Sequence, residues 1–255
     1  MLAKRLTEIM DILGREGSVS VSDLSKRCGV TQKTIRLDLD KLEELNVVSR
    51  VHGGAVLMNN NSDIYPVLSR KQKHTSEKTA IARTALELIE DGDVIFLDAG
   101  TTILELAKQL NKNVIVITND AKVAAELLER DSVTLYCTGG LLQRTNGSFI
   151  YTGTEALHAI ASYHTGKCFM ACSALNFNYG AMVFSGDEAR IKEEIVKASE
   201  KVICLTDYSK FHKTALRSYM PLDRVDVCVT DAQISDEDVA ALNARGVEVK
   251  IASSK

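Results

Sequence analysis

At 255 residues the chain is long for one small domain and short for three, so its length predicts one or two domains. Its composition, 45% hydrophobic and 25% charged, is that of an ordinary globular protein with ample material for a core. No apolar run approaches the ~20 residues that span a bilayer, and the charged N-terminus is unlike a signal peptide. We therefore expect a cytoplasmic protein with no membrane segment.

Charge is distributed unevenly along the chain. Residues 1–78 contain 13 Lys and Arg against 10 Asp and Glu, a net charge of +3, and the remainder contains 18 against 24, a net charge of −6. A basic front on an acidic body is compatible with nucleic acid binding, although ordinary surface charge explains it equally well.

The first 45 residues predict three helices. The first has apolar residues at helical spacing, namely Leu2, Leu6, Ile9, Met10 and Leu13. Residues 20–23 (Ser-Val-Ser-Asp) form a capping box for a short second helix that ends near Arg27. After a turn at Gly29, Thr31 can cap a third helix with the apolar stripe Ile35, Leu39, Leu42 and Leu45. This order predicts a helix-turn-helix.

Polar side chains at the start of the third helix can contact DNA. Gln and Arg make bidentate contacts to base edges, whereas Lys and Thr hold phosphates. Strands at 47–51 and 55–57 flank His52 and two glycines and predict a wing, from which Arg50 and His52 can reach the sugar-phosphate backbone. Any single residue can instead be an ordinary exposed or turn residue. The predicted DNA contacts are Ser20, Thr31, Gln32, Lys33, Thr34, Arg36, Arg50 and His52.

The run VSVSDLSKRCGVTQKTIRLDLDKLEELNVVSRVHGGA resembles the DNA-binding signature of DeoR-family repressors over about 35 residues. That family usually has two arginines after the Thr-Ile step, whereas this chain has Arg36 followed by Leu37. The resemblance implies a winged helix-turn-helix that lacks one phosphate or base contact.

A polar, unpatterned stretch at 58–63, followed by Pro66, predicts a linker. Its basic end, with Arg70, Lys71 and Lys73, can lie on DNA or be a solvated hinge. We expect a DNA-binding domain at 1–57, a linker at 58–76 and an α/β domain at 77–255.

Helical and strand-like segments alternate after residue 77. Strands are predicted at 94–97, 114–118, 133–137, 167–171, 202–206, 225–230 and 247–251. Helices are predicted at 77–90, 102–110, 120–129, 154–162, 187–199 and 235–244. Short Val- and Ile-rich strands between amphipathic helices indicate a mostly parallel sheet covered on both faces.

Polar residues follow several of these strands at the end where parallel sheets bind ligands. The most informative is Asp98-Ala-Gly-Thr-Thr, which opens a helix: Gly100 lets the backbone approach a ligand, Thr101 and Thr102 supply hydroxyls, and a helix N-terminus favours an anion. A simple capped turn has the same composition.

Residues 77–251 resemble the sensor domain of DeoR-family repressors, which is similar in fold to ribose-5-phosphate isomerases and CoA transferases. Four segments carry the resemblance: EKTAIA with IEDGDVIFLDAGTT, VIVITND, TGGLL, and DEARIKEEIVKASEKVICLTDYSKF. The family commonly has an Asp-Lys pair before the strand at 167–171, where this chain has Gly166 and Lys167. A Gly-x-x-Gly turn that follows this strand in the family is replaced by residues 171–174, which puts Ser173 near a ligand.

This resemblance implies an effector site in which Lys192 or Lys210 offsets phosphate charge and Glu188 and Asp207 accept hydrogen bonds from hydroxyls. Glu188 and Lys192 can instead be a surface ion pair, since they stand at i and i+4 on a helix. The implied effector contacts are Asp98, Gly100, Thr101, Thr102, Asn119, Gly140, Ser173, Glu188, Lys192, Asp207 and Lys210.

No cofactor and no metal is predicted. Zinc is conceivable at Cys168 and Cys172, with His158 and His164 nearby, but a three-residue gap within a strand favours buried thiols.

The combined features predict a transcription regulator, most simply a repressor of a sugar or polyol operon that binds double-stranded operator DNA as a dimer or tetramer and is released by a phosphorylated sugar-like effector. An activator is an open alternative. A sugar-phosphate isomerase is another, with Asp98, Glu188 or Lys192 moving a proton. A shared fold, however, does not imply that the same reaction is catalysed.

Overall fold

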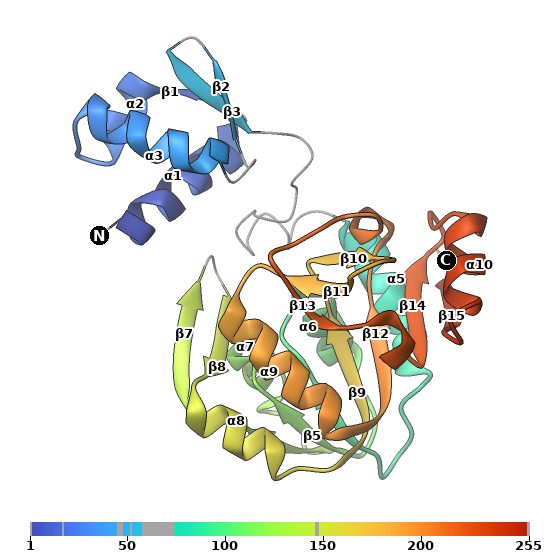
Figure 1. Cartoon of the computed structure of the whole chain (residues 1–255). Coiled ribbons are helices and arrows are strands. Elements are labelled where there is room, and N and C mark those ends of the chain that lie inside the picture. The colour runs from blue at the N-terminus through green and yellow to red at the C-terminus, as the bar shows by residue number, and fades with distance from the viewer. Residues whose placement is uncertain are drawn as a thin grey trace. The chain divides into compact units, whose positions relative to one another are not determined.

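The computed structural model describes residues 2–16, 18–44, 48–51, 53–57, 74–145 and 148–253. The chain divides into two compact units, Met1–Lys73 and His74–Lys255, which we describe separately (Figure 1). Most of the expected linker, including Pro66, Arg70, Lys71 and Lys73, lies outside the described residues, as do Leu45 and His52.

The N-terminal unit has three helices and a small antiparallel sheet. Its helices are α1 (Leu2–Glu16), α2 (Val21–Arg27) and α3 (Gln32–Glu44). Its strands, in the order β1-β3-β2, are β1 (Ser18–Ser20), β3 (Gly54–Leu57) and β2 (Val48–Val51). The predicted apolar stripes form its core, with Leu13, Leu24, Ile35 and Leu39 fully buried.

Local signals fix the ends of these helices. The Ser20 hydroxyl caps α2 by accepting a hydrogen bond from the Asp23 amide at 3.0 Å. A buried carboxylate, Asp38, ties α3 to α1 through an ion pair with Arg5. Strand β1 was not expected, and it pairs with β3 where an added Cβ on Gly54 would lie 2.4 Å from the Val19 carbonyl oxygen. Glycine is therefore required at this close approach.

The C-terminal unit, here called the sensor unit, contains a seven-stranded sheet in the order β15-β14-β12-β9-β4-β5-β6. All of its strand pairs are parallel, as the sequence predicts. The strands are β4 (Val94–Leu97), β5 (Val114–Thr118), β6 (Val133–Cys137), β9 (Thr165–Ala171), β12 (Ser199–Leu205), β14 (Val227–Asp231) and β15 (Glu248–Ala252).

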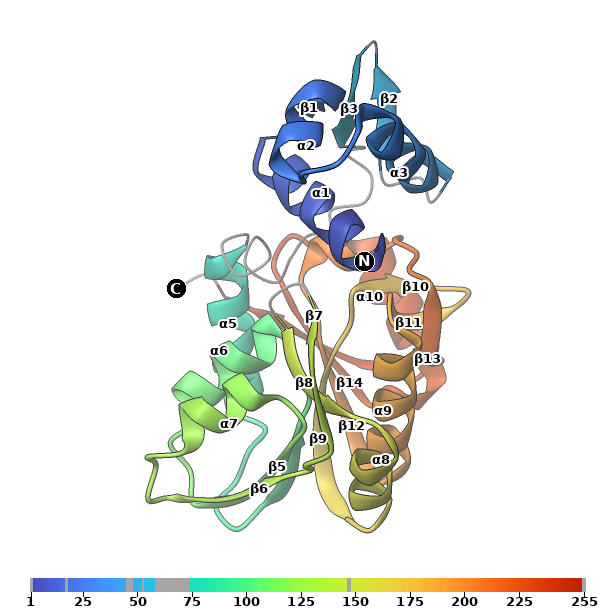
Figure 2. The same ribbon diagram turned by 90° about the vertical axis from the view of Figure 1, so that its left-hand side faces the viewer.

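Helices cover both faces of this sheet (Figure 2). One face packs against α5 (Thr75–Leu86), α6 (Thr101–Gln109) and α7 (Ala121–Leu127), and the other against α8 (Thr154–Ala161), α9 (Gly186–Lys197) and α10 (Asp236–Asn243). Alternate residues of β4 point to opposite faces, so Ile95 and Leu97 join the first core and Phe96 joins the second. Helix α5 ends at Leu86 rather than at residue 90, because the next turn is made by i to i−3 hydrogen bonds of Leu88 and Ile89.

Two antiparallel additions were not predicted from the sequence. One is the hairpin of β7 (Leu141–Thr145) and β8 (Ser148–Thr152), and the other is a three-stranded sheet, in the order β10-β11-β13, of β10 (Ala174–Asn176), β11 (Gly180–Val183) and β13 (Arg217–Met220). Short turns of 3-10 helix, η1 (Tyr208–Lys210) and η2 (Leu222–Arg224), follow β12 and β13. No helix among the described residues is long and apolar enough to cross a membrane.

Candidate DNA-reading helix and effector site

Helix α3 presents most of the predicted DNA contacts to solvent. Gln32, Lys33 and Arg36 are exposed, and the Arg36 guanidinium donates to Gln32 Oε1 at 3.3 Å, one helical turn away. The Thr31 hydroxyl oxygen accepts from the Thr34 amide at 3.2 Å and lies 2.9 Å from the Thr34 hydroxyl. Thr31 and Thr34, like Ser20, therefore take part in hydrogen bonds at the start of a helix, and their hydroxyls already have partners within the protein.

Arg50 connects the wing to α3. Its guanidinium pairs with Asp40 and donates to the Arg36 carbonyl oxygen at 3.2 Å, and its backbone amide donates to Glu43 Oε1 at 2.8 Å. Arg50 Nε is buried without a hydrogen-bond partner among the described residues. The structure thus gives Arg50 a positioning role within the unit, besides any contact to DNA.

Several of the predicted effector contacts lie where the order of strands in the sensor sheet reverses. From β4 the chain adds β5 and β6 on one side, and then β9 pairs with β4 on the other side. Such a reversal is where open α/β sheets bind ligands, outside the carboxyl ends of the strands. Asp98 follows β4 and Ala171 ends β9, so both lie at this point.

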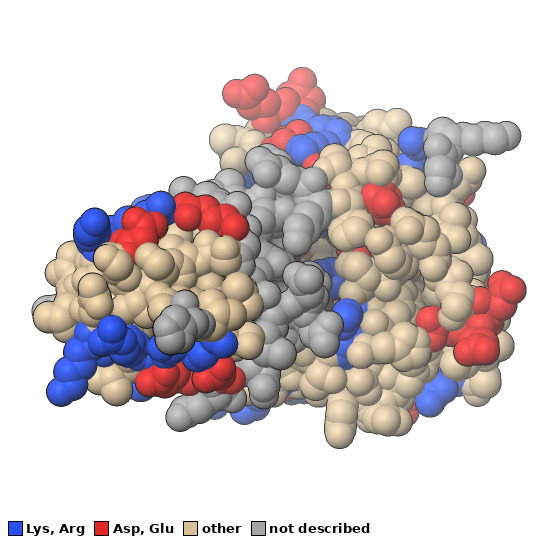
Figure 3. Space-filling view, turned by 90° about the horizontal axis from the view of Figure 1, so that it is seen from above, with Lys and Arg blue, Asp and Glu red and all other residues tan. Residues whose placement is uncertain are grey.

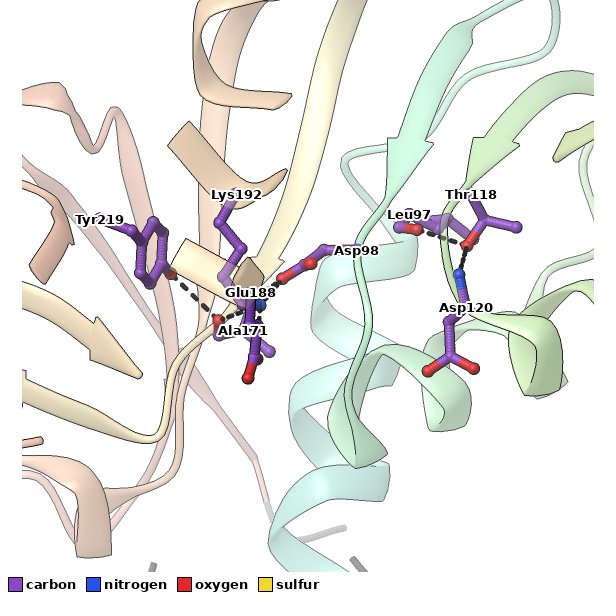
Figure 4. Close-up of polar contacts among 8 residues, drawn as sticks. All are labelled: Leu97, Asp98, Thr118, Asp120, Ala171, Glu188, Lys192 and Tyr219. Carbon is purple, nitrogen blue, oxygen red and sulfur yellow. Dashed lines mark hydrogen bonds and ion pairs between the residues drawn. The ribbon is translucent and has the colours of Figure 1, made fainter. Parts of the chain in front are cut away.

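A buried ion pair occupies the reversal point (Figure 4). Lys192 of α9 contacts Asp98 Oδ2, and the two side chains are 1% and 0% exposed. Asp98 Oδ2 also accepts from the Ala171 amide at 3.0 Å, and Lys192 Nζ donates to the Ala171 carbonyl oxygen at 3.0 Å. Glu188, one turn earlier on α9, lies 3.6 Å from Lys192 Nζ. Glu188 and Lys192 are therefore neighbours at i and i+4 as expected, but Lys192 is buried and Glu188 is 27% exposed.

The environment keeps Lys192 charged. Burial opposes the charge, yet the adjacent Asp98 and Glu188 carboxylates outweigh burial and raise the pKa of Lys192 above its ordinary value. The ammonium is thus committed to two carboxylates. Its positive charge is therefore balanced within the protein by Asp98 and Glu188.

Two buried oxygens at the sheet edge have no hydrogen-bond partner among the described residues: Asp98 Oδ1 and Asn119 Oδ1. Asn119 follows β5, the neighbour of β4, and is 1% exposed. An unpaired buried acceptor costs about 1–3 kcal/mol, so such groups call for an explanation. Bound hydroxyl groups would supply the missing donors.

The remaining implied contacts follow the carboxyl ends of strands of the sheet and have different structural roles. Thr101 and the buried Thr102 open α6, Ser173 follows β9, and Asp207 caps η1 with an oxygen that accepts from the Ser209 amide at 3.1 Å. Lys210 ends η1. Packing alone requires glycine at position 140, because an added Cβ would lie 2.7 Å from the Thr152 carbonyl oxygen. An added Cβ on Gly100 would lie 2.9 Å from Ala171 Cβ, so glycine brings β4 and β9 together here.

Sequence reasoning missed several residues of this region. The Tyr219 hydroxyl, from β13, donates to the Ala171 carbonyl oxygen at 3.0 Å, and Lys192 Nζ lies 5.4 Å from the centre of the Tyr219 ring. The Cys172 thiol donates to Thr206 Oγ1 at 3.6 Å. No local pattern marks Tyr219, since β13 belongs to the unpredicted small sheet. Cys172 was noted only as a conceivable zinc ligand, and the described residues contain no cluster of three side chains that suits a metal.

Asp120, which is not among the implied effector contacts, is buried beside Asn119. Its carboxylate caps α7 by accepting from the Lys122 amide at 2.7 Å, and its own amide donates to Thr118 Oγ1 at 3.1 Å. Burial raises the pKa of Asp120, the helix-end hydrogen bonds oppose this, and the nearby Asp98 adds to it.

His74, the first residue of the sensor unit, contacts the turn beside Asp207. The His74 ring packs edge-on against the Tyr208 ring, with ring centres 5.3 Å apart. Gln233 Nε2 donates to Glu77 Oε1 at 3.1 Å, and Asp231 accepts from the amides of both Tyr208 and Gln233. The start of α5 is thus joined to the turns after β12 and β14.

Comparison with known families decides what kind of protein carries these two sites. The family described as "DeoR-like helix-turn-helix domain" matches residues 5–61, and the one described as "DeoR C terminal sensor domain" matches residues 73–232. The chain belongs to the DeoR family of transcriptional regulators. DeoR-family proteins are regulators rather than enzymes, so the isomerase alternative has no support.

Relatives of this DeoR-family regulator align over nearly its full length. The lactose phosphotransferase system repressor of Streptococcus mutans is 35% identical over 241 residues, 92% of this chain and 94% of that protein. The transcriptional repressor GlcR of Bacillus subtilis is 30% identical over 249 residues, 97% of this chain and 95% of that protein. A ribose 5-phosphate isomerase A from Methanocaldococcus jannaschii aligns at 15% identity with a TM-score of 0.39, over 52% of this chain and 53% of that one.

The buried ion pair of this DeoR-family regulator predicts a large asymmetry between single and double substitutions. Lys192→Met should lower the free energy of unfolding by about 3–5 kcal/mol, because it leaves Asp98 buried without its cation. Adding Asp98→Asn should recover much of that loss in urea unfolding. The matched control is Lys197→Met on the same helix, whose ion pair with Glu194 is 67% exposed on the lysine side and should contribute less than about 1 kcal/mol. Equal losses from both lysines would contradict the structural role of the Lys192–Asp98 pair.

The raised pKa of Asp120 predicts that replacing this residue by asparagine stabilises the protein, and does so more at pH 7 than near pH 4. Since its folded-state pKa lies above the ordinary value of 3.8, its ionised form costs stability, and the cost disappears as pH falls toward that value. Asp120→Asn keeps the helix cap and should raise the free energy of unfolding of the sensor unit at pH 7, because the uncharged amide is not penalised by burial. The difference from the unsubstituted protein should shrink when unfolding is measured near pH 4. Asp236→Asn, at the exposed start of α10, is the control and should show no such gain. A destabilised Asp120→Asn protein at pH 7 would refute the assignment.

Proposed function

We propose that this regulator represses a sugar or polyol catabolic operon in the cytoplasm and leaves its operator when a phosphorylated sugar-type metabolite binds the sensor unit. The names of the two relatives, a lactose phosphotransferase system repressor and the repressor GlcR, support a carbohydrate operon. Binding of an effector is supported above all by two buried oxygens, Asp98 Oδ1 and Asn119 Oδ1, that have no hydrogen-bond partner in the described part of the chain. They lie at the end of the sheet where ligands bind.

The proposed effector meets three kinds of group. Its hydroxyls donate to Asp98 Oδ1 and Asn119 Oδ1, which lack donors among the described residues. Its phosphate lies at the N-terminus of α6, near Thr101, where backbone amides and the helix dipole favour an anion. Lys210 supplies positive charge. Lys192 instead holds Asp98 in place, because its own charge is balanced by Asp98 and Glu188.

Release from DNA requires coupling between two sites. We propose a dimer or tetramer that places two α3 helices in successive major grooves, about 34 Å apart or a multiple of that. An effector that contacts Asp207 or Lys210 would act on the η1 turn, and Tyr208 in that turn packs on His74, where the linker enters the sensor unit. A coupling of about 1–3 kcal/mol through this contact would lower DNA affinity some 5- to 150-fold.

The DNA-binding half predicts a specific loss on substitution of α3. A duplex selected by the full-length protein from a random library is titrated in a gel-shift assay. Arg36→Ala should weaken binding by about 1–3 kcal/mol and relax preference at one base pair, if the guanidinium reads a base. Arg217→Ala, an exposed arginine of the sensor unit, is the control and should leave affinity unchanged. Unaltered binding by Arg36→Ala would remove Arg36 from the reading surface.

The effector half is tested with Asn119→Ala, which should fold well because the Asn119 side-chain oxygen has no partner among the described residues. Phosphorylated pentoses, hexoses and polyols are screened by thermal shift, where a ligand at ~100 times its dissociation constant stabilises the fold by about 2.7 kcal/mol. Asn119→Ala should bind operator normally but need at least about tenfold more of the stabilising compound for release, the effect of one lost hydrogen bond. Normal release by Asn119→Ala, or stabilisation by no phosphorylated compound, would count against this site.

A further inference from the structure

Helix α3 carries an apolar side chain where its surroundings are polar. Ile35, Leu39 and Leu42 of α3 are buried in the core of the N-terminal unit, whereas Leu37 is 55% exposed. One exposed leucine is ordinary in a folded protein. Its position on the helix is what distinguishes Leu37.

Leu37 lies near the centre of the exposed face of α3. At 3.6 residues per turn, it lies one turn from Lys33 in one direction and one turn from Lys41 in the other, roughly opposite the buried stripe. Lys33, Leu37 and Lys41 are all exposed. The leucine therefore stands in a row between two ammonium groups.

Nearby contacts suit this face to a negatively charged partner. Arg36 is held along the helix by Gln32, and the negative charge of Asp40 is balanced by Arg50 from the wing. Figure 3 shows Lys and Arg side chains clustered on the N-terminal unit with Asp and Glu beside them. The cations complement phosphates, and the apolar side chain between them offers a contact for an apolar group on the same partner.

The major groove of DNA offers one such group on a base edge, the C5 methyl of thymine. We propose that Leu37 packs on a thymine methyl group and so selects an A·T base pair in each half of the operator. This inference rests on the proposed DNA-binding function and adds the chemistry of one contact. Lys33 and Lys41 neutralise phosphates on either side, and Leu37 contributes base preference rather than general affinity.

Replacement of thymine by deoxyuridine removes only the methyl group. Full-length protein first selects its preferred duplex from a random library, and each thymine of that duplex is then changed to deoxyuridine in turn. At one position in each half-site the unsubstituted protein should lose about three- to fivefold in affinity, the expected effect of one buried methyl group. Leu37→Ala should bind thymine and deoxyuridine duplexes equally at that position. Leu128→Ala, which removes a 75% exposed leucine of the sensor unit, should keep the full difference.

The outcomes separate this inference from the function on which it rests. If the protein selects a duplex and binds it with salt-sensitive affinity, but every deoxyuridine duplex binds as well as its thymine counterpart, Leu37 does not read a methyl group. The same conclusion follows if Leu37→Ala keeps the thymine preference of the unsubstituted protein. If the protein enriches no duplex at all, the DNA-binding function fails together with the Leu37 contact. If Leu37→Ala folds poorly, a thymine scan of the unsubstituted protein that finds no sensitive position still refutes the contact.

Discussion

The ion pair between Asp98 and Lys192 is the contact on which the proposed effector site depends. It joins the end of β4 to α9, and both partners bond to Ala171 at the end of β9, so one pair of charges fixes three elements at the point where strand order reverses. Removing two charges from water is costly, and the cost is offset only where hydrogen bonds complete the pair. The Ala171 amide and carbonyl supply those bonds, and Tyr219 adds a second donor to the same carbonyl.

The two carboxylate oxygens of Asp98 differ in their hydrogen bonds. Oδ2 is used inside the protein, whereas Oδ1 is left with no partner among the described residues. With Glu188 close by, two carboxylates face one ammonium, so the immediate surroundings carry more negative than positive charge. An anionic group on an effector is then best placed away from the pair, at the start of α6, with its hydroxyl groups toward Asp98 and Asn119.

The sequence predicted most of the fold because local patterns determine it. Short Val- and Ile-rich strands between amphipathic helices indicated the seven parallel strands, and the Ser20 cap and the Gly29 turn marked the helix-turn-helix correctly. For the proposed sites, the sequence predicted individual residues but not the contacts between them. The pairing of Lys192 with Asp98, the tie from Arg50 to Asp40 and the Tyr219 contact join residues far apart in the chain, and no spacing rule reveals them. The strands β10, β11 and β13 are short and gain their order from pairing with one another, so their sequences carried no separate signal.

Release of the operator by an effector requires that binding at the sensor site and binding of DNA by α3 be linked, and linkage is reciprocal. Calorimetric titration of the stabilising phosphorylated compound into free protein and into the protein saturated with its selected duplex measures this most directly. The compound should bind the DNA complex more weakly, by the same factor by which it lowers DNA affinity. Equal affinity of the compound for free and DNA-bound protein would show that the two units act independently, and the protein would then not be an effector-released repressor.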